Sequence, residues 1–216
     1  MARITVLGGS GYVGAAVVAE AAKRGHDVTA VSRSEVEAPV AGVEYVVGSA
    51  LEVGVLEAVT DGRDVVVVAL SPRGDMAGKL EGVVEDLVAR LDATPTRLAY
   101  IGGVSSLLVE EGGPSLWDAS HEQLPAEVKP EVETGLNAFA LLKASPASLD
   151  WFYVSPPADF GAWLGTESKG EYVLGGDVLL KDADGNSTIS AADLALAILD
   201  EIETPAHRRG RFTAIG

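Results

Sequence analysis

The sequence contains no cysteine. This absence excludes disulfide bonds, thiolate catalysis and metal sites built from cysteine, and it favours a cytoplasmic protein. No apolar run reaches membrane-spanning length, and no charged-then-apolar leader precedes the first strand. Basic residues are also few, because 16 lysines and arginines face 32 aspartates and glutamates, for a formal net charge of −16. Since such a charge repels nucleic acid and anionic lipid, we expect neither as a partner.

The 216 residues suffice for one α/β domain and are few for two, and 47% of them are apolar. We therefore predict a single domain over residues 1–216. Apolar strand patterns alternate with helical ones, and the expected strands are 27–32, 43–47, 64–70, 97–101, 149–154 and one that begins at Arg3 and runs up to Gly8. This alternation indicates a Rossmann-type doubly wound parallel sheet with helices on both faces. A strand–Gly-Gly–strand pattern over Glu171–Lys181 and a later helix predict a small C-terminal hairpin-plus-helix portion.

Three glycines follow the first strand at the spacing Gly8-x-x-Gly11-x-x-Gly14. A tight turn needs a residue without Cβ, and the backbone must come close to the phosphates, so this spacing suits a dinucleotide pyrophosphate. A helix follows at once, with Val13, Val17 and Ala21 on one face, and its free N–H groups favour an anion. The alternative is a glycine-rich turn in another α/β fold. The strand before and the helix after favour a dinucleotide site.

The residue after the second strand selects the cofactor. An NAD-type site places an acidic residue about 20 residues beyond the loop, where it binds the ribose 2′-hydroxyl. Arg33 stands at that place, and a guanidinium matches the 2′-phosphate of NADP. Glu35 and Glu37 follow closely and weaken this assignment, and a surface arginine is the alternative. We predict that NADP(H) is favoured over NAD(H).

Ligands of doubly wound sheets bind beyond the carboxyl ends of the strands. The segments that leave those ends are 8–14, 32–34, 48–50, 70–74, 102–106 and 155–160. We expect Gly103, in the turn after the fifth strand, to contact the cofactor. Residues 110–124, which include His121, are predicted to form a loop over the site, followed by a helix over 126–144. An inert surface loop is the alternative for 110–124.

Several stretches also carry a resemblance to a known family. They are Gly8-Gly-Ser-Gly-Tyr-Val-Gly14, Gly102-Gly-Val-Ser-Ser106, Leu149-Asp-Trp-Phe-Tyr-Val-Ser-Pro-Pro-Ala-Asp-Phe160, and parts of the tail between Tyr172 and Thr213. With them the chain resembles the putative NADH-flavin reductase family, which consists of atypical short-chain dehydrogenases related to biliverdin-IXβ (flavin) reductase. The resemblance covers nearly the whole chain.

The resemblance implies roles for individual residues. Ser10, Gly11, Tyr12 and Val13 would hold the pyrophosphate, and Arg33 the 2′-phosphate. The residues implied to line the rest of the cofactor are Leu70, Ser71 and Arg73, with Ser105 near the nicotinamide and Pro156 beside it. Two positions depart from the family pattern. Ser49 replaces an aspartate that reaches the adenine in many relatives, so its contact is weaker or absent, and Ala158 replaces the histidine of the flavin reductase.

A proton donor of the usual short-chain dehydrogenase type is missing. In that type, a lysine four residues after a tyrosine lowers the tyrosine pKa, so that the tyrosine can protonate a carbonyl oxygen. The residues four after Tyr12, Tyr45, Tyr100, Tyr153 and Tyr172 are Ala16, Ser49, Val104, Pro157 and Gly176. Hydride transfer to a flavin or quinone remains feasible, because such acceptors delocalise charge and water can supply the proton. Ser105 is the candidate catalytic residue, and Phe160, Trp163 or Tyr172 could stack on the acceptor.

One acidic stretch resembles a calcium-binding loop. Residues Asp182–Asp193 place oxygen ligands at several loop positions, but Ser187 replaces the required glycine and Asp193 the bidentate glutamate. A turn at Asp184-Gly185 followed by a Ser190-x-x-Asp193 capping box explains the pattern better. We predict no metal site.

These observations favour an NAD(P)H-dependent reductase that transfers a hydride to a flavin, a quinone or a similar small conjugated acceptor. Two alternatives stay open. One is an NmrA-like redox sensor, which binds the dinucleotide without turnover, and the other is an enzyme like the nucleotide-sugar epimerases and dehydratases. The sequence leaves the oligomeric state, monomer or homodimer, undetermined.

Overall fold

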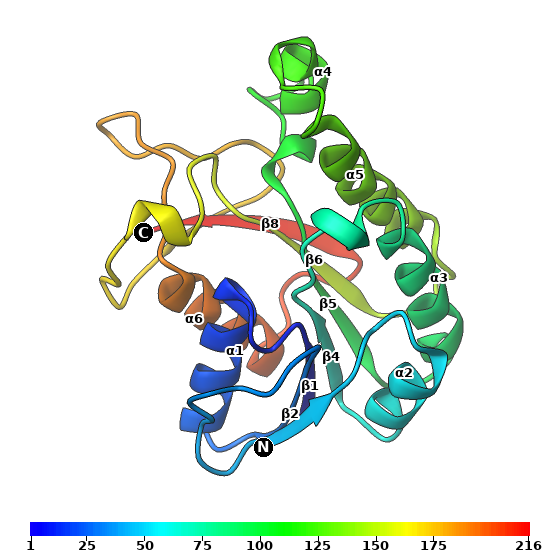
Figure 1. Cartoon of the computed structure of the whole chain (residues 1–216). Coiled ribbons are helices and arrows are strands. Elements are labelled where there is room, and N and C mark those ends of the chain that lie inside the picture. The colour runs from blue at the N-terminus through cyan, green and yellow to red at the C-terminus, as the bar shows by residue number, and fades with distance from the viewer.

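Strands from the whole length of the chain form one sheet in the computed structural model, which describes residues 1–216 apart from the side chain of residue 75 (Figure 1). In chain order the strands are β1 (Arg3–Leu7), β2 (Asp27–Ser32), β3 (Glu44–Val47), β4 (Val65–Val68), β5 (Arg97–Ile101), β6 (Trp151–Ser155), β7 (Val173–Gly175) and β8 (Gly210–Ile215). Their spatial order is β3-β2-β1-β4-β5-β6-β8-β7, and β7 alone of these strands runs antiparallel to its neighbour. The predicted Rossmann-type doubly wound sheet is confirmed.

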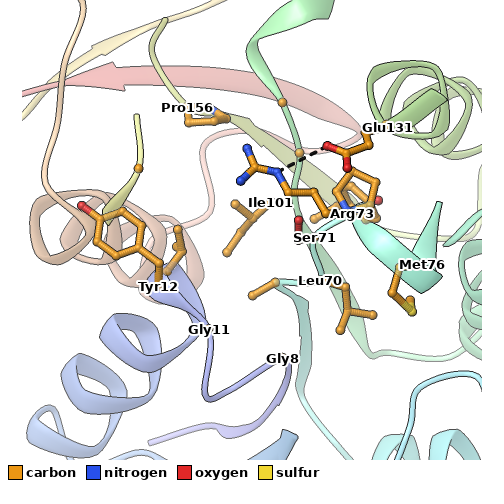
Figure 2. Close-up of a pocket in the computed structure, with 18 of the residues that line it drawn as sticks. Gly8, Gly11, Tyr12, Leu70, Ser71, Arg73, Met76, Ile101, Glu131 and Pro156 are labelled. Carbon is orange, nitrogen blue, oxygen red and sulfur yellow. Dashed lines mark ion pairs between the residues drawn. The ribbon is translucent and has the colours of Figure 1, made fainter. Parts of the chain in front are cut away.

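The carboxyl ends of the parallel strands meet at one edge of the sheet. Gly8 follows β1 and Ile101 ends β5 at this edge, and both line the pocket drawn in Figure 2. The edge is where doubly wound sheets bind their ligands.

Helices cover both faces of the sheet. They are α1 (Tyr12–Lys23), α2 (Val53–Thr60), α3 (Leu80–Leu91), α4 (Leu116–Ser120), α5 (Lys129–Ala144) and α6 (Ala191–Glu203), with short 3₁₀ turns η1 (Gly74–Met76), η2 (Val104–Ser106), η3 (His121–Gln123) and η4 (Ala162–Leu164). Helices α1 and α6 pack on one face, and α2, α3 and α5 on the other. Among the described residues, no helix has the length and apolar character that crossing a membrane requires.

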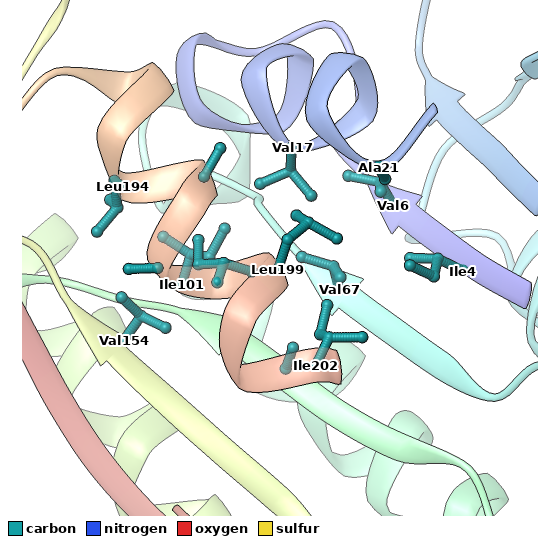
Figure 3. Packing of buried hydrophobic residues seen from close by; sticks show 14 of the residues in the cluster. Ile4, Val6, Val17, Ala21, Val67, Ile101, Val154, Leu194, Leu199 and Ile202 are labelled. Atoms are coloured by element: carbon teal, nitrogen blue, oxygen red, sulfur yellow. The ribbon is translucent and has the colours of Figure 1, made fainter. Parts of the chain in front are cut away.

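The apolar runs of the inner strands bury their side chains on both faces. All four valines of β4 are buried, and they alternate between the two cores: Val67 belongs to the core under α1 and α6, and Val66 to the other. Figure 3 shows Leu199 and Ile202 of α6 over Val67. Because both faces of a parallel strand are covered, a continuous apolar run is its expected signature.

Most of the expected elements are present, with ends that shift by a few residues. Helix α5 begins at Lys129 within the predicted 126–144, and the predicted loop 110–124 contains α4 and η3. Helix α2 and strand β8 were not among the expected elements.

The pairing of the C-terminal segment differs from the predicted hairpin. Strand β7 pairs antiparallel with β8, whereas the peptides of Asp177 and Leu179 bond to Leu108, at 2.8 and 2.9 Å. The side chain of Leu180 fills the space beside Gly175, where a Cβ would lie 2.6 Å from it. Arg211 of β8 holds the Asp177 carboxylate at 2.6 Å. These long-range contacts replace the local strand pairing.

The first half of the predicted capping box at the start of α6 is confirmed, with Ser190 as the N-cap residue. The Ser190 hydroxyl oxygen accepts the Asp193 N–H at 2.9 Å and donates to the Asp193 carboxylate at 2.9 Å. The same carboxylate accepts the N–H groups of Lys169 and Gly170, so Asp193 joins α6 to the segment before β7. Asp182 accepts the N–H groups of its own turn.

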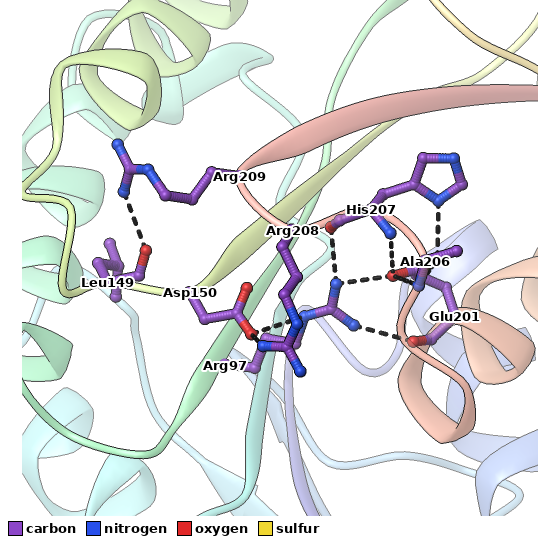
Figure 4. A network of polar contacts seen from close by, with 8 residues as sticks. All are labelled: Arg97, Leu149, Asp150, Glu201, Ala206, His207, Arg208 and Arg209. Carbon is purple, nitrogen blue, oxygen red and sulfur yellow. Dashed lines mark hydrogen bonds and ion pairs between the residues drawn. The ribbon is translucent and has the colours of Figure 1, made fainter.

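A buried ionic network joins α6 to the opposite, amino-terminal edge of the sheet (Figure 4). Arg97, which begins β5, contacts Glu201 at 2.6 Å, and Glu201 contacts the His207 ring at 2.7 Å. Arg97 also donates to the His207 carbonyl at 2.7 Å. Burial alone would raise the pKa of Glu201, but its hydrogen bonds with His207 and Arg97 lower that pKa on balance.

Candidate functional site

A cavity of about 830 Å³ opens at the carboxyl edge of the sheet. Its walls come from the loops after β1, β2, β3, β4, β5 and β6 and from the first half of α5. The predicted site residues that line it are Gly8, Ser10, Gly11, Tyr12, Val13, Arg33, Ser49, Leu70, Ser71, Arg73, Gly103, Ser105 and Pro156. These residues are far apart in the sequence, and the fold brings them together around one cavity. Gly14 is not among the lining residues.

At Gly8 and Gly9, the turn after β1 is packed so tightly that a side chain does not fit. A Cβ on Gly8 would lie 2.5 Å from the carbonyl oxygen of Ala69, and the φ of Gly8 is +86°. The N–H groups of Gly8 and Gly9 both donate to the Val31 carbonyl, at 2.9 and 3.0 Å, which ties the turn to β2. Gly9 was missing from the predicted set. A Cβ there would lie 2.7 Å from that of Ala30, and the Gly-Gly pair in the sequence was the available signal.

The first turn of α1 completes a cradle for an anion. Gly14 lies against the Gly8 carbonyl oxygen, since a Cβ at Gly14 would be 2.1 Å from it. Gly11 is the N-cap residue without a capping side chain, and no acidic residue stands in the first turn. The leading N–H groups of a helix have no partner within the helix, and its dipole makes this end positive. A backbone cradle that Cβ atoms would fill, at a positive helix end, fits a pyrophosphate.

Arg33 and Ser49 mark the far end of the cavity from the Ser105 turn. Arg33 comes directly after β2 and is exposed, and Ser32 shapes this turn by donating to the Ser34 carbonyl at 2.7 Å. Ser49 follows β3. Its N–H donates to Glu52 at 3.3 Å, and its hydroxyl accepts the Leu51 N–H at 3.2 Å. Ser49 thus has local hydrogen-bond partners at the start of α2.

Arg73 extends across the cavity mouth from the loop after β4 (Figure 2). Its Nε lies 3.5 Å from a carboxylate oxygen of Glu131 in the first turn of α5. Its guanidinium carbon lies 5.7 Å from the ring centre of Trp163, in η4. Glu131 was not among the predicted residues, although it falls in the predicted helix 126–144. Arg73 therefore links three separate segments at the mouth.

The turn after β5 is supported from below by β6. The Gly103 N–H donates to the Tyr153 hydroxyl at 3.2 Å, and a Cβ on Gly102 would lie 1.7 Å from that hydroxyl oxygen. Ser105 lines the cavity from this turn. Burial raises the pKa of Tyr153, while Gly103, Arg211 and Ser106 act in the opposite direction. Tyr153 is therefore a neutral phenol at neutral pH.

The aromatic residues considered for stacking divide into two groups. Phe160 and Trp163 line the cavity, and Phe160 contacts the ring of Tyr12 at a centroid distance of 5.4 Å. Trp163 is 69% exposed. Tyr172 lies outside the lining, and its hydroxyl donates to Asp200 of α6. Stacking on the acceptor by Tyr172 is therefore not supported.

The segment 110–124 lies beside the site, and its described residues are absent from the lining. The His121 ring stacks on Trp117 at 5.0 Å and contacts the Trp117 carbonyl oxygen at 2.9 Å. This segment projects beyond α5 in Figure 1. The geometry favours the surface-loop alternative over a loop that covers the cavity.

Comparisons with known proteins agree with this geometry. The family model described as NAD(P)H-binding matches residues 8–205. The uncharacterized protein YwnB of Bacillus subtilis (strain 168) is 33% identical over 219 residues, which covers 99% of this chain and 98% of that protein.

Two solved structures cover almost the whole chain. A putative NADH-flavin reductase from Streptococcus pneumoniae has a TM-score of 0.88 and 29% identity, and the match covers 100% of this chain and 99% of that chain. A putative epimerase from Bacteroides thetaiotaomicron has a TM-score of 0.83 and 31% identity, with coverage of 99% and 97%. Similar folds thus carry names from two different reaction classes.

Proposed function

This chain belongs to the NAD(P)H-binding family, and we propose that it is an NADPH-preferring oxidoreductase that transfers a hydride to a flavin, a quinone or a similar conjugated acceptor. One observation carries the proposal. The cavity continues from the glycine cradle and Arg33 to the Ser105 turn and the exposed ring of Trp163. It therefore offers a dinucleotide cradle and a second, partly aromatic region in one enclosure, where two rings can meet.

The residues of the cradle have distinct proposed tasks. The backbone from Gly8 to Val13 holds the pyrophosphate, and Arg33 holds the 2′-phosphate of NADPH. Leu70, Ser71 and Arg73 line the cofactor beyond β4. Pro156 borders the nicotinamide, and Ser105 contacts the carboxamide or the acceptor. The bound cofactor supplies the hydride. The protein aligns the two rings and excludes water from them.

The choice of acceptor rests on what the chain lacks and on its similarity. Its tyrosines have no lysine four residues later, which disfavours ordinary alcohol–ketone chemistry. The structure with a TM-score of 0.88 is named a putative NADH-flavin reductase, which supports a conjugated acceptor. The same tyrosine–lysine absence disfavours epimerase chemistry.

The first experiment measures oxidation of NADPH, and of NADH in parallel, with FMN, riboflavin and a panel of quinones. We expect acceptor-dependent turnover that is faster at low NADPH than at low NADH. Tight binding of NADP⁺ and NADPH with similar affinities, without turnover on any acceptor, would instead support a redox sensor of the NmrA-like kind. Turnover with equal preference for the two cofactors would refute the NADPH assignment alone.

A further inference from the structure

The hydroxyl of Tyr153 lies beside the turn that carries Ser105, where it accepts the Gly103 N–H at 3.2 Å. Tyr153 is 1% exposed, and the residue lines the cavity together with Ser105. Its ring stacks on Tyr100, with centroids 5.4 Å apart and an interplanar angle of 8°, and contacts Phe139 at 4.2 Å. This packing fixes the position of the hydroxyl. Because its oxygen accepts the Gly103 N–H, its own proton is left to donate.

A buried cation, Arg211, contacts Ser106, which is the neighbour of this hydroxyl. Arg211 of β8 donates to the Ser106 hydroxyl and carbonyl oxygens, both at 2.9 Å, and its side chain is 6% exposed. A hydrogen bond from Ser106 and the positive charge of Arg211 both favour the phenolate form of Tyr153. Asp177 fixes the guanidinium from its other side, at 2.6 Å. In the series Arg211–Ser106–Tyr153, a cation favours the phenolate form of a tyrosine, as the lysine does in a tyrosine–lysine pair. The three residues come from two strands and a turn.

We propose that Tyr153 is the proton donor of the reaction and that it favours acceptors with a ring carbonyl, the quinone class. This inference rests on the proposed function. The acceptor ring takes the hydride of the reduced nicotinamide, an electron pair moves to the ring oxygen, and that oxygen takes the phenolic proton. Water returns a proton to Tyr153 by way of the Ser106 hydroxyl. One hydride and one proton thus convert a quinone to a hydroquinone.

The test compares two acceptors that differ in their need for a proton. A naphthoquinone needs one, whereas a cationic phenothiazinium dye becomes neutral when it takes a hydride. We expect Tyr153→Phe to lower kcat for the quinone by about 100-fold, the size of a general acid contribution. The kcat for the dye should stay within about threefold, because the removed group has no proton to give there. Ser106→Ala should lower quinone turnover in the same selective way, but less.

Tyr100→Phe is the matched control, since it removes the hydroxyl of the stacked neighbour and leaves the Gly103 contact intact. It should change the quinone-to-dye ratio of kcat values little. A second readout needs no turnover: the Kd of the naphthoquinone for the cofactor-free protein, by calorimetry. Loss of one hydrogen bond in Tyr153→Phe should raise this Kd about fivefold.

The outcomes separate the two proposals. If Tyr153→Phe slows quinone and dye equally, or slows neither, the proton-donor assignment is overturned and the reductase assignment stands. If the wild-type protein reduces neither acceptor, the proposed function fails. In that case, a naphthoquinone Kd that is the same in Tyr153→Phe as in wild type would also overturn the contact between Tyr153 and the quinone oxygen. A larger Kd in Tyr153→Phe would support that contact.

Discussion

At the scale of residues, the cofactor end of the cavity combines a backbone cradle with a single predicted charge contact. The cradle is independent of side chains, since its glycines leave room for backbone atoms only. We therefore propose that it binds the pyrophosphate, which NADH and NADPH have in common. We expect discrimination between the two cofactors to come from the residue after β2, which is Arg33.

Replacing Arg33 tests this division of labour. We expect Arg33→Asp to weaken NADPH binding by about 100-fold, because it exchanges a charge-assisted contact with the 2′-phosphate for repulsion. The affinity for NADH should fall by less than about threefold, since a carboxylate suits the ribose 2′-hydroxyl. Fluorescence titration of both cofactors measures the two Kd values. An equal loss for both would remove Arg33 from the 2′-phosphate site.

Residue contacts that join distant parts of the chain were the hardest to predict. The glycine spacing and Arg33 could be read from the sequence because both sit within one strand–helix–strand unit. Tyr153 and Gly103 are 50 residues apart, and Arg211 and Ser106 are 105 apart. No local pattern signals such pairs. A search for a tyrosine followed by lysine therefore dismissed Tyr153, although the fold gives it a cation by another route.

At the scale of elements, the strength of the local pattern decided what could be predicted. The valine run of β4 and the helical stripe of α3 are buried as expected. Helix α2 has eight residues, and its Gly54 interrupts the pattern. Strand β8 was missed because it follows a turn rich in arginine. The pairing of β7 depends on β8, so it could not be predicted before β8 was known.

Helices α1 and α2 each have a glycine in the first turn, and the two make a matched pair. A Cβ on Gly14 would lie 2.1 Å from the Gly8 carbonyl oxygen, whereas no atom lies within 4 Å of one on Gly54. We expect Gly54→Ala to stabilise the protein by about 0.5–1 kcal/mol, because alanine loses less backbone entropy. Gly14→Ala should destabilise it by about 1–3 kcal/mol through overpacking. It should also weaken NADPH binding.

Thermal and urea unfolding of the two variants measure these effects, with the Kd of NADPH as a second readout. Gly54→Ala should leave that Kd unchanged, since Gly54 is absent from the described lining of the cavity. A stable Gly14→Ala protein with normal NADPH affinity would contradict the tight packing of α1 against the turn after β1.

At the scale of the whole molecule, ionic contacts at the edge of the sheet away from the cavity hold α6 in place. Glu201 is 5% exposed and contacts both Arg97 and His207, which lie before or at the start of strands β5 and β8. Glu203, two residues on, contacts Arg24 with its side chain 39% exposed. A buried carboxylate that keeps its charge makes folding depend on pH, whereas an exposed ion pair contributes little.

The pKa of Glu201 is lower in the folded protein than the ordinary value of 4.5. A lowered pKa contributes stability that is fully present above the unfolded value and is lost as the pH falls through the folded value. We expect Glu201→Gln to lower the free energy of unfolding at pH 7 by about 3 kcal/mol, because Arg97 stays buried and keeps only the longer contact with Asp150, at 3.6 Å, as a counter-charge. The difference from wild type should shrink below pH 4.5. Glu203→Gln, on the same helix, should lower the free energy of unfolding by less than about 1 kcal/mol.

Urea unfolding from pH 3 to 8 measures all three proteins. Parallel pH curves for wild type and Glu201→Gln would show that Glu201 does not cause the loss of stability in acid.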